Sequence, residues 1–130
     1  MKTRISTDEA PAAVGPYSQA IRAGDTVYVA MQIPLDPATG QLVAGDVSAQ
    51  TRQVMRNIAA ILEAAGTSWA NVVKTTVYLA DIDDFAAMNA VYAEFVDDAP
   101  PARAAFAARD LPRGAAVAVD AIAVMVFAQP

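Results

Sequence analysis

The chain has 130 residues, of which 55% are hydrophobic and 18% are charged, so we expect one well-folded globular domain over residues 1–130. It contains no Cys and no His, which excludes disulfides, Cys-ligated metals and hydrolases that use a Ser-His or Cys-His pair. The net charge is −5 without any cluster of Lys and Arg, which argues against nucleic acid and anionic membranes as partners.

No apolar run of signal-peptide or membrane-spanning length occurs, so we expect a cytoplasmic protein.

The first third of the chain has the composition of three short strands. Residues 3–6 are the first predicted strand, and residues 10–17, with two Pro and one Gly, are a predicted loop. Residues 18–23 and 26–33 flank an Ala-Gly-Asp turn, which predicts a hairpin.

Two helices are expected in the middle of the chain. Asp46 is a predicted N-cap and Gly66 suits the position after the C-cap. Between them, apolar and small side chains share one stripe at helical spacing: Val47, Thr51, Val54, Met55, Ile58, Leu62 and Ala65. A second helix follows Asp84, with Phe85, Met88, Tyr92 and Phe95 on one face. The acids Asp81, Asp83 and Asp84 at its start suit the helix dipole better than a calcium loop, so we expect no metal.

Three further strands complete an α+β domain of order β-β-β-α-β-α-β-β, with one sheet and two helices. They cover residues 72–79, 102–108 and 116–127. Both faces of the last strand are almost wholly apolar, whereas two helices can cover only one face of a sheet of about six strands. The uncovered face therefore predicts a closed, symmetric homo-oligomer.

Arg103 is the most informative single residue, because it is a charge within an apolar strand of alanines and one phenylalanine. Such a charge needs an anionic partner from the protein or from a ligand. One interpretation is a receptor for a carboxylate or phosphate. The other is an arginine on an edge strand whose side chain reaches out to water.

Seven sequence blocks, in order, resemble the Rid family, also called the YjgF or translation-inhibitor family. They are GPYSQA (15–20), QIPLDPATG (32–40), NIAAILEAAG (57–66), VVKTTVYLADIDDF (72–85), MNAVYAEF (88–95), PAR (101–103) and LPRGAAVAVDAIAV (111–124). The resemblance spans nearly the whole chain. It implies a chorismate-mutase-like fold, with a six-stranded mixed sheet and two helices on one face. It also implies a homotrimer with clefts between subunits, no cofactor, and hydrolysis of 2-aminoacrylate or other 2-imino acids to 2-keto acids and ammonia.

The same resemblance assigns roles to four positions. Arg103 matches the arginine that binds the substrate carboxylate, which suits its bidentate fork. Tyr17 matches a tyrosine that lines the cleft, and Asn89 matches an asparagine of a family motif on the second helix. Ala105 stands where the family often has cysteine, and its backbone is expected to contact the substrate.

Two departures from the family pattern bear on catalysis. Ala30 and Met31 replace a Ser-Gly pair, so a hydroxyl is lost and a bulky thioether is gained. Ala118 replaces the first glutamate of a Glu-x-Glu pattern, which is thought to position the attacking water, and Asp120 replaces the second. These residues share a strand face about 7 Å apart, so Asp120 can hold a water only if the cleft is reshaped.

The sequence is compatible with three functions. The first is an imine deaminase with an altered substrate range or reduced activity. The second is a non-catalytic protein of the same fold that binds or senses small carboxylates through Arg103. The third, a ribonuclease, is disfavoured by the acidic charge and the missing His.

Overall fold

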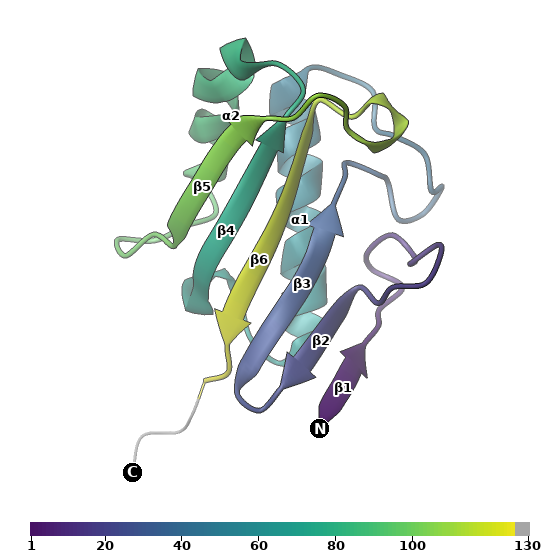
Figure 1. Cartoon of the computed structure of the whole chain (residues 1–130), viewed down its shortest axis with the longest axis vertical. Helices are drawn as coiled ribbons and strands as arrows, with labels where there is room; N and C mark the ends of the chain where they lie inside the picture. The colour runs from purple at the N-terminus through teal and green to yellow at the C-terminus, as the bar shows by residue number, and fades with distance from the viewer. Residues whose placement is uncertain (127–130) are drawn as a thin grey trace.

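The computed structural model describes residues 1–126, which form one mixed sheet with two helices packed on one of its faces (Figure 1). The elements are β1 Lys2–Ile5, β2 Ala20–Ala23, β3 Thr26–Gln32, α1 Val47–Ala65, β4 Val72–Leu79, α2 Phe85–Tyr92, β5 Ala102–Ala107 and β6 Val117–Val124. This confirms the predicted α+β class and the predicted order of elements. Neither helix of this part of the chain is long and apolar enough to span a membrane.

The strand order in the six-stranded sheet is β1-β2-β3-β6-β4-β5. β4 and β5 are parallel and are connected through α2, whereas all other neighbouring strands are antiparallel. β6 therefore lies between the N-terminal hairpin strands and the β4–β5 unit, as Figure 1 shows. β5 is an edge strand, so its residues lie at one border of the sheet.

The long helix α1 begins and ends as its sequence predicts. The carboxylate of Asp46 accepts a hydrogen bond from the N–H of Ala49 at 3.0 Å, and Gly66 adopts φ 89°, a left-handed conformation that glycine adopts without strain. The predicted stripe faces the sheet, and Val54, Met55 and Leu62 are fully buried there. Capping and burial thus specify the same helix.

Several element ends differ from the prediction. β2 begins at Ala20 instead of residue 18, because the side chain of Gln19 hydrogen bonds to the 7–11 loop. α2 ends at Tyr92, so Phe95 lies beyond the helix, although its ring still packs 6.5 Å from that of Trp69. β6 spans Val117–Val124, and the predicted strand end at Phe127 lies outside the described residues.

The sheet face opposite the helices carries large exposed side chains. Tyr28 of β3 is 50% exposed, and Phe106 of β5 is 47% exposed. Tyr28 pairs with Ile122 and Phe106 pairs with Tyr78, so this surface extends across the sheet. Apolar side chains thus stay in contact with solvent on this face of a single chain.

Candidate functional site

Arg103 lies on the helix side of edge strand β5, where it faces α2. Its Nη1 donates a hydrogen bond of 2.6 Å to Oδ1 of Asn89. The guanidinium carbon lies 4.9 Å from the ring centre of Tyr92 and 5.4 Å from that of Phe85, which are cation–π distances. The arginine is therefore held in place by an amide and two aromatic rings.

No carboxylate of the described residues neutralises this arginine. Within residues 1–126 the ion pairs are Arg52–Glu94 and Arg109–Asp110. A cavity of about 530 Å³ adjoins the guanidinium, and it is lined by Asn89, Tyr92, Ala93, Val96, Pro100, Pro101 and Arg103. A positive charge with a fixed orientation therefore faces an open cavity, and a small anion fits this arrangement.

Tyr17 lies at a second cavity, in a different part of the chain. This cavity has a volume of about 590 Å³ and is lined by Ala12, Val14, Tyr17, Ala30, Met31, Ile33, Leu35, Pro112 and Arg113. The N–H of Val14 donates to the Tyr17 hydroxyl at 3.3 Å, which closes the loop between them. Apart from the Tyr17 hydroxyl and the Arg113 guanidinium, the cavity walls are apolar side chains.

A strand irregularity brings both Ala30 and Met31 to this cavity. The pairing of β3 with β6 is regular up to Val29 and Ala121 and resumes at Gln32 and Val119, with a bulge between them. The bulge bends the strand and turns side chains away from strict alternation. Ala30 and Met31 therefore both line the cavity.

Asp120 and Ala118 lie on the open face of the sheet, opposite the helices. Ala118 is fully buried under its neighbours and pairs with Tyr78 of β4. The hydroxyl of Tyr78 donates a hydrogen bond of 2.7 Å to Oδ2 of Asp120, and its ring packs edge-on against Phe106 at 5.3 Å. The hydrogen bond to the Asp120 carboxylate, followed by burial, raises the pKa of Tyr78 above its usual value of about 10.

Within one chain, the predicted site residues therefore lie in three separate places. Arg103, Asn89 and Ala105 belong to the helix side of β5. Tyr17, Ala30 and Met31 line the second cavity. The open sheet face carries Ala118 and Asp120.

Sequence patterns do not identify two further residues at these places. Strand alternation predicts only which face Tyr78 is on, because its hydrogen-bond acceptor Asp120 is 42 residues away. Arg113 has φ 59°, and its guanidinium donates to Gly40 O at 2.9 Å and to Gln41 Oε1 at 3.3 Å. These acceptors are neutral, so Arg113 adds a positive charge at the second cavity. The Arg-Gly pair in a turn was the available signal for its conformation.

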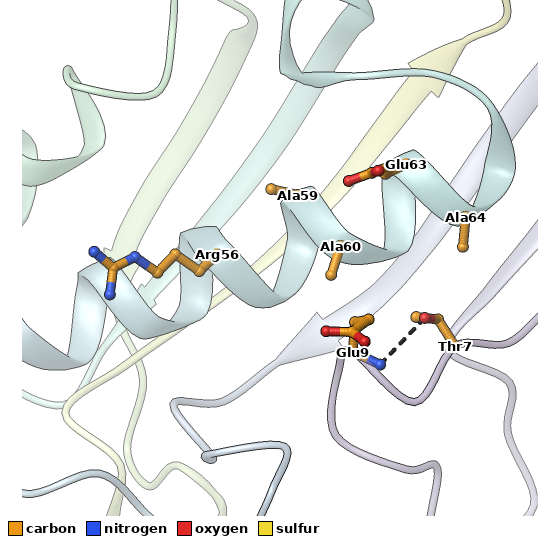
Figure 2. A pocket seen from close by; sticks show the side chains of 7 residues that line it. All are labelled: Thr7, Glu9, Arg56, Ala59, Ala60, Glu63 and Ala64. Atoms are coloured by element: carbon orange, nitrogen blue, oxygen red, sulfur yellow. Dashed lines mark hydrogen bonds between the residues drawn. The ribbon is translucent and has the colours of Figure 1, made fainter.

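A third cavity lies on the outer side of α1, as Figure 2 shows, and contains none of the predicted site residues. Its volume is about 670 Å³, and Thr7, Glu9, Arg56, Ala59, Ala60, Glu63 and Ala64 line it. Across residues 1–126, no group of three or more acidic side chains is placed to hold a metal ion. We therefore assign the candidate site to the first two cavities and the open sheet face.

Comparisons with known proteins give the context of this geometry. The family model described as endoribonuclease L-PSP matches residues 7–125. The mouse protein named 2-iminobutanoate/2-iminopropanoate deaminase is 50% identical over 92% of this chain and 88% of its own length.

Two solved structures are also similar along almost the whole chain. RidA from an Antarctic Psychrobacter is 46% identical, with a TM-score of 0.91 over 95% of this chain and 99% of that one. TdcF from E. coli, solved with bound serine, is 38% identical, with a TM-score of 0.90 over 95% of this chain and 99% of that one. Together with the family model, these similarities show that this chain belongs to the Rid family.

Proposed function

We propose that this protein is a Rid-type imine deaminase, which hydrolyses 2-aminoacrylate or other 2-imino acids to 2-keto acids and ammonia. The observation that carries the proposal is Arg103, fixed by Asn89 and two aromatic rings, without a carboxylate partner in the described chain. A bidentate guanidinium suits the one fixed anion that all 2-imino acids share. The name of the mouse relative and the serine bound to TdcF support the same class of ligand.

We further propose that the complete site forms between subunits of a homotrimer. The Arg103 cavity supplies a guanidinium but few apolar walls for a substrate side chain, whereas mostly apolar side chains line the Tyr17 cavity. The two half-sites are complementary, and the exposed face with Tyr28 and Phe106 offers an apolar surface for a second copy. Association would therefore cover this face and bring two half-sites together.

The hydrolysis of a 2-imino acid needs only a small lowering of its barrier by the protein. A water molecule adds to C2 of the protonated imine and gives up one proton to a base. The carbinolamine then receives that proton on nitrogen, and the C–N bond breaks as the hydroxyl oxygen forms the carbonyl. The hydroxyl proton passes to the departing ammonia, so ammonium and the 2-keto acid leave. Arg103 would orient the substrate, the backbone near Ala105 would contact the imine, and Asp120 would hold the water. Positioning lowers the barrier of such an intrinsically easy reaction.

The departures from the family pattern predict an enzyme with a lower rate and a different substrate range. Ala118 offers a buried methyl group where the family has a carboxylate, so we propose a lower rate than in relatives with glutamate. Ala30 and Met31 make the second cavity more apolar, so we propose a shift in the side chains it accepts. We propose that the protein acts in the cytoplasm without a cofactor.

A second candidate function is a protein that binds small carboxylates without turning them over. The buried Ala118 favours it, because the usual water-positioning carboxylate is absent from that position. Both functions share Arg103 as the anchor, so turnover is what separates them.

The test is to generate 2-imino acids in the assay and to follow their decay. An amino acid oxidase supplies imines with small, branched and aromatic side chains, and the purified protein is added to each. Acceleration of decay that disappears in Arg103→Ala and persists in Arg109→Ala supports the deaminase, since Arg109 is a fully exposed arginine. Binding of 2-keto acids by calorimetry without any acceleration supports the second function instead.

A further inference from the structure

The open face of the sheet carries a hydrogen-bonded tyrosine–carboxylate pair, formed by Tyr78 and Asp120. The Tyr78 hydroxyl donates to Oδ2 of Asp120 at 2.7 Å, and the Tyr78 ring is held edge-on against Phe106. Tyr78 itself pairs across the ladder with Ala118, and Asp120 pairs with Thr76. The phenol therefore reaches from the strand position opposite Ala118 to the carboxylate two residues further along β6.

The strand register places this pair beside the Tyr17 cavity. Asp120 lies between Val119, which pairs with Gln32, and Ala121, which pairs with Val29. It is therefore opposite the bulge that carries Ala30 and Met31, and both of these residues line the cavity. The backbone of Asp120 is therefore one strand spacing, about 5 Å, from the strand segment that carries Ala30 and Met31.

The hydrogen bond gives the carboxylate a fixed orientation. Tyr78 occupies Oδ2, so Oδ1 is the oxygen that stays available to a water molecule. A tyrosine is protonated at neutral pH, and the hydrogen bond to Asp120 raises the pKa of Tyr78 further, so the phenol acts there as the donor. A phenol donor and an ionised carboxylate acceptor form a charge-assisted bond, which holds the pair more firmly than a neutral hydrogen bond.

We propose that Tyr78 is a positioning residue that orients Asp120, so that Asp120 holds the attacking water in place of the carboxylate missing at position 118. This inference rests on the proposed deaminase function. Asp120 Oδ1 accepts the proton that the water loses on adding to C2 of the imine, and the same proton passes to the departing nitrogen. The hydrogen bond from Tyr78 thus gives Asp120 the orientation that an aspartate at this position needs in order to hold the water.

The experiment compares steady-state kinetics of the full-length wild type with Tyr78→Phe, Asp120→Asn and the double variant. Phenylalanine keeps the ring against Phe106 and removes only the hydroxyl. We expect kcat to fall roughly tenfold or more in Tyr78→Phe, the effect of one lost hydrogen bond to a charged group, with KM within about twofold. Asp120→Asn should lower kcat on the order of a hundredfold. The double variant should have the same kcat as Asp120→Asn, because both substitutions disable the same Tyr78–Asp120 pair.

Thr3→Val is the control, because it removes an exposed hydroxyl from strand β1 of the same sheet, outside both cavities of the candidate site. Its kcat should equal that of the wild type, and thermal unfolding should show all variants folded at the assay temperature. An active wild type whose kcat survives Tyr78→Phe, or additive losses in the double variant, would overturn the inference and leave the deaminase function intact. A wild type inactive on every imine overturns both.

Discussion

Arg103 and Asp120 lie on opposite faces of the same sheet. Their partners on the intervening strand β4 are the consecutive residues Thr75 and Thr76, and consecutive residues of a strand point to opposite faces. The guanidinium is held on the helix side by Asn89, and the carboxylate is held on the open side by Tyr78. Both groups can act on one substrate only if they come from two copies of the chain.

A subunit-mixing experiment tests this consequence. Arg103→Ala and Asp120→Asn should each lose most of the deaminase activity. When the two variants are unfolded, mixed in equal amounts and refolded together, about a quarter of the sites should combine an intact Arg103 with an intact Asp120. Activity should therefore return to about a quarter of the wild-type value. A mixture that stays as inactive as its components would show that both groups act within one chain.

Arg103→Lys should bind 2-keto acids much more weakly than the wild type. A lysine keeps the charge but loses the planar fork and the stacking against Tyr92 and Phe85. We expect a loss of roughly tenfold or more in affinity for Arg103→Lys and a larger loss for Arg103→Ala. Calorimetry measures both, and the exposed Arg109→Lys serves as the control. Equal affinities for lysine and arginine would contradict a bidentate anchor.

Met31→Gly should change the choice of substrate. The thioether of Met31 occupies part of the wall of the Tyr17 cavity, so its removal gives a larger space. We expect the ratio of kcat/KM for an aromatic over a small 2-imino acid to rise by about tenfold, the usual effect of a few methylene groups in an apolar pocket. Val73→Gly, on an exposed strand position outside this cavity, controls for the added glycine. An unchanged ratio would place the substrate side chain elsewhere.

Gln19→Glu should destabilise the protein and loosen the loop that carries Val14 and Tyr17. The buried amide of Gln19 accepts from the N–H of Thr7 and donates to the carbonyls of Thr7, Ala10 and Pro11. A carboxylate cannot donate, so these carbonyls lose their partner and face a charge, at a cost of about 3 kcal/mol or more. Urea unfolding measures the change, and Gln53→Glu on α1, which gives up one side-chain hydrogen bond to Asn57, is the control for the change from amide to carboxylate. A change below about 1 kcal/mol would contradict this role.

The Tyr78–Asp120 pair should make stability depend on alkaline pH. The folded-state pKa of Tyr78 is raised, so the hydrogen bond contributes fully below the unfolded-state pKa of about 10. Its contribution is lost as the pH rises above about 10 and through the folded-state pKa. The difference in melting temperature between the wild type and Tyr78→Phe should therefore stay constant up to about pH 10 and shrink between about pH 10 and pH 12. A constant difference across that range would show that the hydroxyl does not stabilise the fold.

The sequence predicted the elements well because their signals are local. The cap at Asp46, the left-handed Gly66 and the stripe containing Val54 and Leu62 all fall within one helix. Strand alternation likewise grouped Arg103 with Ala105. Each of these inferences needs only neighbours within a few residues.

The arrangement of the site could not be predicted, because it depends on pairings between distant residues. Alternation within β5 and β6 does not tell which faces coincide, and that relation is fixed by the register of both strands with β4. The bulge that brings Ala30 and Met31 to one cavity is an irregularity of pairing, with no marker in composition. The bond from Tyr78 to Asp120 joins two strands 42 residues apart.

The central place of β6 has a consequence for how the protein is made. β6 leaves the ribosome after the five other strands of the sheet, yet it pairs with both β3 and β4 and joins the two parts of the sheet. Until Val117–Val124 has been synthesised, the nascent chain holds two incomplete sheets with unpaired inner edges. The domain therefore cannot complete its folding during translation of its earlier residues, and chains truncated before β6 should be substrates for chaperones and proteases.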